Sequence, residues 1–171
     1  MFSNNQINIS ELPNIQDLEM TPIDRRYKFI LLINIIGLYG IGTVGLIVAR
    51  SISTDRHFRY ISVYLICVLI FAMLVQGIIY YLGFKKRGFA LREKDICYSH
   101  GYLVNKTLAL PYNRIQHIEI ARSFMARKLG LASLKIYSAG ESGGDMVIHG
   151  LPKALAESQY TFLTKIINEQ L

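Results

Sequence analysis

Hydrophobic residues along this chain form two long uninterrupted runs, followed by short segments in which apolar and polar residues alternate. The runs cover residues 29–49 and 60–84, and neither contains a charged residue. About twenty apolar residues in a helix cross a hydrocarbon core of about 30 Å, and a backbone in lipid must satisfy its own hydrogen bonds. The two runs therefore predict two transmembrane helices.

Positive charges near the ends of the runs predict the orientation of this hairpin. The connector 50–59 is short, so the helices are expected to be antiparallel neighbours. Lys and Arg concentrate on the cytoplasmic side of membrane proteins, so both termini are predicted to be cytoplasmic, with Lys85, Lys86 and Arg87 anchoring the second helix at the lipid surface. The cations near the outer ends are Arg25, Arg26, Lys28, Lys85, Lys86, Arg87 and Arg92, against Arg50, Arg56 and Arg59 in the connector.

Small residues in the first run predict a helix-packing face. Gly45 and Ala49 are four positions apart and share one side of a helix. Small side chains let two backbones approach closely in lipid, although glycine is also common in membrane helices that make no such contact. We favour a packing face that consists of Gly37, Gly42, Gly45 and Ala49.

Each run also contains one amide residue, Asn34 in the first and Gln76 in the second. Counted from the predicted cytoplasmic ends at 1.5 Å per residue, their depths differ by about 4–5 Å. The two side chains are candidates for a hydrogen bond across the hairpin or between subunits, worth about 0.6 kcal/mol. Each amide bonding its own helix backbone or a water molecule is the alternative, and both stay open.

From Phe89 onward the hydrophobic period changes to two. Alternating segments surround Ile96, Ile118, Leu134 and Ile148, and turns are expected at Gly101, 111–113, Gly130 and 140–144. This pattern predicts a half-buried antiparallel sheet. Within it, residues 123–129 predict a short helix that Ser123 caps and Gly130 ends.

The C-terminal segment predicts an amphipathic helix that covers the sheet. Pro152 suits the first turn of a helix, and an apolar stripe follows it. The stripe consists of Leu155, Phe162, Leu163, Ile166 and Ile167. The chain is thereby divided into an N-terminal cytoplasmic tail (1–24), a transmembrane hairpin (25–84) and a cytoplasmic domain (85–171).

A specific set of residues, sharpest between Leu110 and Gly140, resembles a known family. With two membrane helices ahead of it, this set is similar to the bacterial membrane-flanked PH-like domain family (DUF304 or bPH2), in particular its short YdbS-like members. The resemblance covers about Tyr27 to the C-terminus, and the family implies a fold and a location more than an activity. The matching positions are Gly101, Pro111-Tyr112-x-Arg114-Ile115-Gln116, Arg122-Ser123, Arg127-x-x-Gly130-Leu131-Ala132 and Ala139-Gly140.

The fold class that follows is a membrane α-hairpin of two transmembrane helices plus an α+β PH-like domain. The resemblance implies that this domain is a bent antiparallel β-sheet or open barrel capped by a C-terminal helix, placed at the cytoplasmic face of the bacterial inner membrane. Periodicity alone predicts the same combination of sheet and capping helix.

Several classes of function are disfavoured by the composition and the motifs. The net charge of +7 comes largely from cations that flank the apolar runs, so we expect membrane topology rather than nucleic-acid binding. The glycine-rich segment 140–145 lacks the lysine and hydroxyl spacing of a phosphate-binding loop. Cys67 and Cys97 are expected to be free thiols. His100, His117 and His149 fall on different strands without ligand spacing, so we expect no metal, no cofactor and no catalytic site.

Four cations of the domain, three of them arginines of the family pattern, are the candidate contacts, together with Lys85, Lys86 and Arg87. They can hold anionic headgroups near a membrane surface, each for about 1 kcal/mol. Alternatively, the arginines are structural and bond loop carbonyls, Glu119 or Glu141. The four are Arg114, Arg122, Arg127 and Lys128.

Two functions are compatible with a domain tethered so closely to the membrane. The first is a non-enzymatic module that binds a partner membrane protein, such as a related multi-pass PH-like protein, or that self-assembles. The second is an anionic-lipid-binding component of an envelope-stress or lipid-handling system. Membrane lipids are expected partners in either case, and nucleic acid is not.

Overall fold

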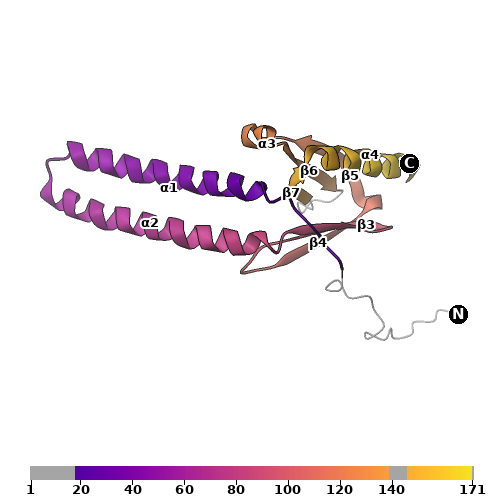
Figure 1. Cartoon of the computed structure of the whole chain (residues 1–171), viewed down its shortest axis with the longest axis horizontal. Coiled ribbons are helices and arrows are strands. Elements are labelled where there is room, and N and C mark those ends of the chain that lie inside the picture. Colours follow the sequence, from indigo (N-terminus) through magenta and orange to yellow (C-terminus); the bar gives the residue numbers. More distant parts are fainter. Residues whose placement is uncertain (1–17, 139–145, 171) are drawn as a thin grey trace, which may run out of the picture.

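Two long helices project from one end of a β-rich domain (Figure 1). The computed structural model describes residues 18–138 and 146–170. Helix α1 spans Tyr27–Ile52 and helix α2 spans Arg56–Phe84, so both extend beyond the apolar runs into their polar flanks. The connector is accordingly shorter than predicted. Asp55 caps α2 by accepting a hydrogen bond from the main chain of His57 at 2.9 Å, and Arg50 donates to the carbonyl oxygen of Arg59.

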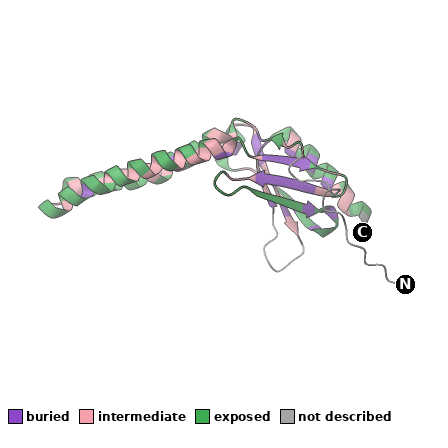
Figure 2. Cartoon of the chain, turned by 90° about the horizontal axis from the view of Figure 1, so that it is seen from below, coloured by how far each residue is buried: buried purple, intermediate pink, exposed green. Residues whose placement is uncertain are grey.

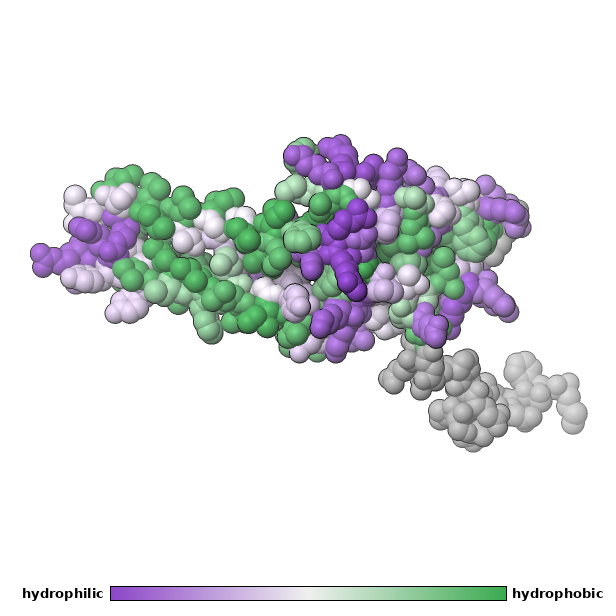
Figure 3. Space-filling view, viewed as in Figure 1, coloured by the Kyte–Doolittle hydropathy of each residue, from purple (hydrophilic) through white to green (hydrophobic). Residues whose placement is uncertain are grey.

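Both helices are long and apolar enough to cross a membrane. Their residues are mostly exposed, whereas several strands of the domain are largely buried (Figure 2). Hydrophobic side chains cover the length of the hairpin, and hydrophilic ones gather at its two ends (Figure 3). A continuous apolar surface of this size marks an interaction site for lipid or protein rather than a surface for water. The two helices are therefore candidate membrane spans.

The domain consists of two antiparallel sheets and a covering helix. The first sheet has the order β1-β2-β3-β4 and the second β5-β6-β7. The strands are β1 (Thr21–Pro22), β2 (Gly88–Leu91), β3 (Asp95–His100), β4 (Lys106–Pro111), β5 (Ile115–Ala121), β6 (Leu131–Ser138) and β7 (Met146–Pro152), with a 3-10 turn η3 (Tyr112–Arg114) between β4 and β5.

Strand β1 lies in the part of the predicted N-terminal tail that the structure describes. Its residues pair with β2, Thr21 opposite Phe89 and Pro22 opposite Gly88. Because β1 precedes α1 and β2 follows α2, the first sheet joins the two chain segments that leave the hairpin.

Helix α4 (Lys153–Gln170) packs across the second sheet, as the apolar stripe predicts. Leu163 is fully buried in the core, whereas Phe162 remains 46% exposed and meets Tyr112 edge-on. Pro152 ends β7 instead of opening the helix, because it still pairs with Leu131 of β6. The main core contains Ile96, Ile118, Leu134, Ile136, Ile148, Leu151 and Leu163.

The predicted short helix forms as α3 (Phe124–Lys128). The Ser123 side chain accepts a hydrogen bond from the main chain of Ala126 at 3.2 Å, and Gly130 follows with a φ of +70°. Ala126 and Leu131 pack with Ile30 of α1 in a second small core. The predicted turn at 140–144 lies outside the described residues.

We expect Gly150→Ala to destabilise the protein. Gly150 has a φ of +76°, and a Cβ placed there would lie 2.7 Å from Cβ and Cγ of Tyr27. Overpacking of this kind costs about 1–3 kcal/mol, so thermal unfolding of the purified protein in detergent should occur at a clearly lower temperature. Gly40→Ala is the matched control, because a Cβ at Gly40 meets no atom within 4 Å. Equal melting temperatures for the two variants would show that Tyr27 does not pack on Gly150.

Candidate functional site at the junction of hairpin and sheet

The hairpin joins the domain through very short chain segments. The amide of Asp24 donates to the carbonyl of Gly150 at 2.9 Å just before α1, and β2 begins at Gly88, four positions after α2 ends at Phe84. Asp24 also forms an ion pair with Arg26 at 2.7 Å, and this hydrogen-bonded contact lowers the pKa of its carboxyl. The ends of both helices are therefore held directly against the sheets.

A cleft of about 580 Å³ lies at this junction. Helix residues form one wall, and the two sheets form the opposite wall. Its lining residues are Tyr27, Leu31 and Tyr80 from the helices, Arg87 from the segment after α2, Tyr98, His100, Lys106 and Leu108 from β3 and β4, and Val147 and His149 from β7.

Stacked rings and one guanidinium organise the cleft. The ring of Tyr27 is parallel to that of His149 at a centroid distance of 5.8 Å, and the guanidinium of Arg87 lies 5.8 Å from the Tyr27 ring centroid. Tyr98 stacks on His100 at 5.1 Å. Cation–π contact restricts the guanidinium without neutralising it. Arg87 is thus a fixed positive charge in the cleft.

The electrostatic potential of the cleft is positive. Burial lowers the pKa values of both His100 and His149, and the charge of Arg87 lowers them further. Lys106 adds to the effect at His100, and no Asp or Glu is among the lining residues that the structure describes. The Nδ1 atom of His100 is buried without a hydrogen-bond partner among described residues, whereas Nδ1 of His149 lies 3.0 Å from the Ser133 hydroxyl. The arrangement suits an anionic group.

The predicted interfacial cations divide between the cleft and its surroundings. Arg87 lines the cleft. Lys85 and Lys86 are exposed, with their ammonium groups 5.9 Å from the Tyr81 ring and 5.3 Å from the Tyr102 ring. Lys and Arg beside aromatic rings are typical of a lipid–water interface.

The other four predicted contact cations, Arg114, Arg122, Arg127 and Lys128, do not converge on the cleft. Arg122 donates to the carbonyl oxygen of Leu131 at 3.1 Å. This bond to a main-chain carbonyl is the structural role that the sequence analysis gave as the alternative to a headgroup contact. Glu119 instead contacts Tyr137 at 3.0 Å and Lys135 at 3.5 Å, and Glu141 lies outside the described residues. The remaining members, Arg114 at the end of η3 and Arg127 and Lys128 on α3, are exposed.

The predicted helix-packing residues also separate. A Cβ at Gly42 would lie 3.7 Å from Leu69 of α2, whereas Gly37 and Gly45 have open space beside them and Ala49 is exposed. Gln76 accepts a hydrogen bond from the Tyr39 hydroxyl at 2.5 Å, and Asn34 lines a different pocket beside α3. Within one chain, the partner of Gln76 is therefore Tyr39; pairing between subunits stays a prediction.

Sequence reasoning did not predict the cleft, although it singled out three of its lining residues, Arg87, His100 and His149. Tyr98, His100 and Lys106 had a usable signal, since alternate residues of β3 share one face and His100 pairs with Lys106 in register. The contact between Tyr27 and His149 had no signal in the sequence, because it depends on how the second sheet packs against α1.

Among the described residues, no cluster of three or more His, Cys, Asp or Glu is placed to hold a metal ion. Burial raises the pKa of the Cys97 thiol, which makes it a weak nucleophile.

The two cleft histidines predict a loss of stability in mild acid. Their folded-state pKa values lie below the ordinary 6.5, so the unfolded chain takes up protons first as the pH falls through that value. Thermal stability in detergent should therefore decline below pH 6.5, and the double variant His100→Gln, His149→Gln should flatten the decline. Asp24 and Glu119, whose pKa values are lowered, lose their stabilisation only at more acidic pH. His117→Gln, at an exposed position, is the control, and an unchanged decline in the double variant would contradict the assignment.

Comparison with known proteins identifies the family. The family model described as bacterial PH domain matches residues 29–170, which includes both long helices and the domain from β2 to α4. No curated protein and no solved structure matches the chain. Because the family model covers most of the chain, and the sheets and capping helix are those that the sequence resemblance implies, this chain belongs to the bacterial PH domain family.

Proposed function

We propose that this protein is a non-enzymatic, membrane-anchored binding module whose junction cleft holds the headgroup of an anionic lipid. In this proposal the hairpin spans the bacterial inner membrane, and the PH-like domain lies on the cytoplasmic leaflet with both termini on that side. The observation that carries the proposal is the amphiphilic cleft, which has a cationic sheet wall and an apolar helix wall at the membrane end of the domain.

The polar wall suits a phosphate or carboxylate group. Arg87 offers a planar fork of donors, and the ring of Tyr27, which itself stacks on His149, holds it in place. Lys106 adds a second positive charge to the lining of the cleft. Cations at the membrane surface contribute about 1 kcal/mol each toward an anionic headgroup.

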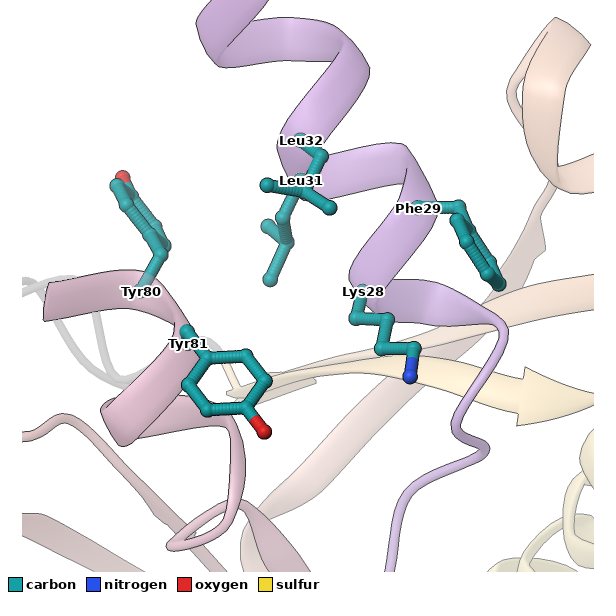
Figure 4. Close-up of a pocket in the computed structure, with 6 residues that line it drawn as sticks. All are labelled: Lys28, Phe29, Leu31, Leu32, Tyr80 and Tyr81. Atoms are coloured by element: carbon teal, nitrogen blue, oxygen red, sulfur yellow. The ribbon is translucent and has the colours of Figure 1, made fainter. Parts of the chain in front are cut away.

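The apolar wall leads to the hairpin. Leu31 and Tyr80 line both the cleft and a smaller pocket of about 220 Å³ between the ends of α1 and α2. Figure 4 shows that Leu31 lies between α1 and α2, whereas Phe29 points away from α2. A ligand with its charged end in the cleft and an acyl chain along this seam matches both walls. Such a module fits a lipid-handling or envelope-stress system.

Membrane insertion is supported by the distribution of charge. Apolar side chains cover the exposed length of both helices, and hydrophilic ones gather at the end next to the domain (Figure 3). In the sequence, Arg25, Lys28, Lys85 and Lys86 lie next to the start of α1 and the end of α2. A chain with more Lys and Arg at that end places it in the cytoplasm. Two such helices whose side chains are mostly unburied have no other nonpolar environment within the chain.

A second candidate function is docking of a related PH-like membrane protein or a second copy. Two observations favour it. The outer edge of β4 has no paired strand among the described residues, and an open edge is a template for another strand. The surface of α1 around Gly37 and Gly45 has room for a close helix neighbour.

The lipid proposal predicts a stability shift that depends on the cleft cations. Phosphatidylglycerol added to the protein in neutral detergent should raise its melting temperature more than phosphatidylcholine does, since the headgroup binds only the folded cleft. Arg87→Gln and Lys106→Gln should each weaken the apparent affinity about fivefold, because one cation contributes about 1 kcal/mol.

Lys153→Gln and Lys165→Gln are matched controls, since both remove one positive charge from the exposed face of α4. Lys106→Gln also guards against misfolding, because Lys106 is exposed and its loss leaves the Arg87–Tyr27 contact in place. An equal response to both lipids, or an undiminished response to phosphatidylglycerol in both Arg87→Gln and Lys106→Gln, would exclude this function.

The docking proposal predicts an oligomer that depends on the edge of β4. Ala109→Lys places a charge on that exposed edge and should shift the protein toward monomer in mild detergent, as measured by light scattering after size-exclusion chromatography. Ser158→Lys, on the exposed side of α4, should leave the mass unchanged. A wild-type protein that is already monomeric would remove self-association through this edge.

A further inference from the structure

The turn between β3 and β4 carries an exposed apolar tip beside α2. Leu103 is 75% exposed and Val104 is 68% exposed. The neighbouring Tyr102 packs on the last turn of α2, since a Cβ at Gly83 would lie 3.0 Å from the Cβ of Tyr102. Gly101, with a φ of +107°, makes this tight turn possible, because a side chain there would collide with the carbonyl oxygen of Val104. The tip is thus fixed against the hairpin.

Helix α3 carries a second exposed apolar group, beside α1. Phe124 is 60% exposed, and the ammonium of Lys128 lies 4.7 Å from its ring centroid. The opposite side of α3 is anchored, because Ala126 packs with Ile30 in the first turn of α1. This helix therefore cannot turn Phe124 inward.

The two groups lie on opposite sides of the hairpin, near the ends of both helices. Figure 1 shows α3 beside the start of α1 and the β3–β4 turn beside the end of α2. Gly83 is one position before the end of α2, and Ile30 is three after the start of α1. At 1.5 Å per residue both anchor points lie within about 5 Å of the helix ends. Each apolar group also has a lysine over its aromatic ring, Lys86 over Tyr102 and Lys128 over Phe124.

We infer that the PH-like domain inserts these two tips into the same leaflet that the hairpin crosses, so that it rests on the bilayer at three points. The partner is the lipid surface itself. Tyr102 holds the tip against Gly83 near the end of α2, so lipid that reaches the end of α2 also lies beside the exposed Leu103 and Val104. An apolar side chain flanked by lysine enters the headgroup boundary to about 5–10 Å. The inference rests on the proposed membrane insertion of the hairpin, but it does not depend on any ligand in the cleft.

The absence of tryptophan from the sequence allows a direct test. Leu103→Trp and Phe124→Trp each place a single fluorophore at an exposed position in the full chain, reconstituted into phosphatidylcholine vesicles with brominated acyl chains. We expect bromine to quench both tryptophans and their emission to be blue-shifted. The control for a cytosolic position is Ser158→Trp on the exposed side of α4, which should show neither effect, and the control for the span is Leu74→Trp on α2, which should show both.

The outcomes separate this inference from the proposed function. Quenching of Leu74→Trp without quenching of both tip variants would leave the hairpin in the membrane and overturn the three-point contact. Failure to quench Leu74→Trp would overturn membrane insertion and, with it, the inference. The vesicles contain only zwitterionic lipid, so the result is independent of anionic-headgroup binding.

Discussion

The packing of Tyr27 on the main chain of Gly150 sets the position of the hairpin on the domain. Gly150 lies in β7 of the second sheet, and Tyr27 opens α1. The positive φ and the missing side chain of Gly150 let the ring lie directly on the strand, where it also stacks with His149. The same ring holds the guanidinium of Arg87 over the cleft. One aromatic residue thus joins the helices, the second sheet and the charged group of the candidate site.

This contact between α1 and the second sheet explains why the site is formed from residues far apart in the chain. Arg87 follows α2, His100 and Lys106 belong to the first sheet, and His149 belongs to the second. Together they form a positive cleft because the short segments at Asp24 and between Phe84 and Gly88 hold the domain against the helix ends.

The sequence predicts the elements well and their meeting points poorly. Uninterrupted apolar runs and alternating segments identify both long helices, the strands and α4, since hydrophobic period follows directly from backbone geometry. Strand β1 has only two residues and so shows no hydrophobic period, and it pairs with β2, which follows both long helices in the sequence. Similarly, the hydrogen bonds of Arg122 with the carbonyl of Leu131 and of Gln76 with Tyr39 depend on tertiary packing. The cleft depends on it most, because its walls come from both helices and both sheets.

The pairing of β1 with β2 makes the hairpin an insertion inside the first sheet. Both long helices occupy the connection between two adjacent antiparallel strands, where other proteins have a turn. During synthesis β1 is made first but remains without its neighbour until all of α2 has been made. The first sheet can therefore close only after both helices have folded back and their ends have returned to one side, so completion of that sheet reports that the hairpin has assembled.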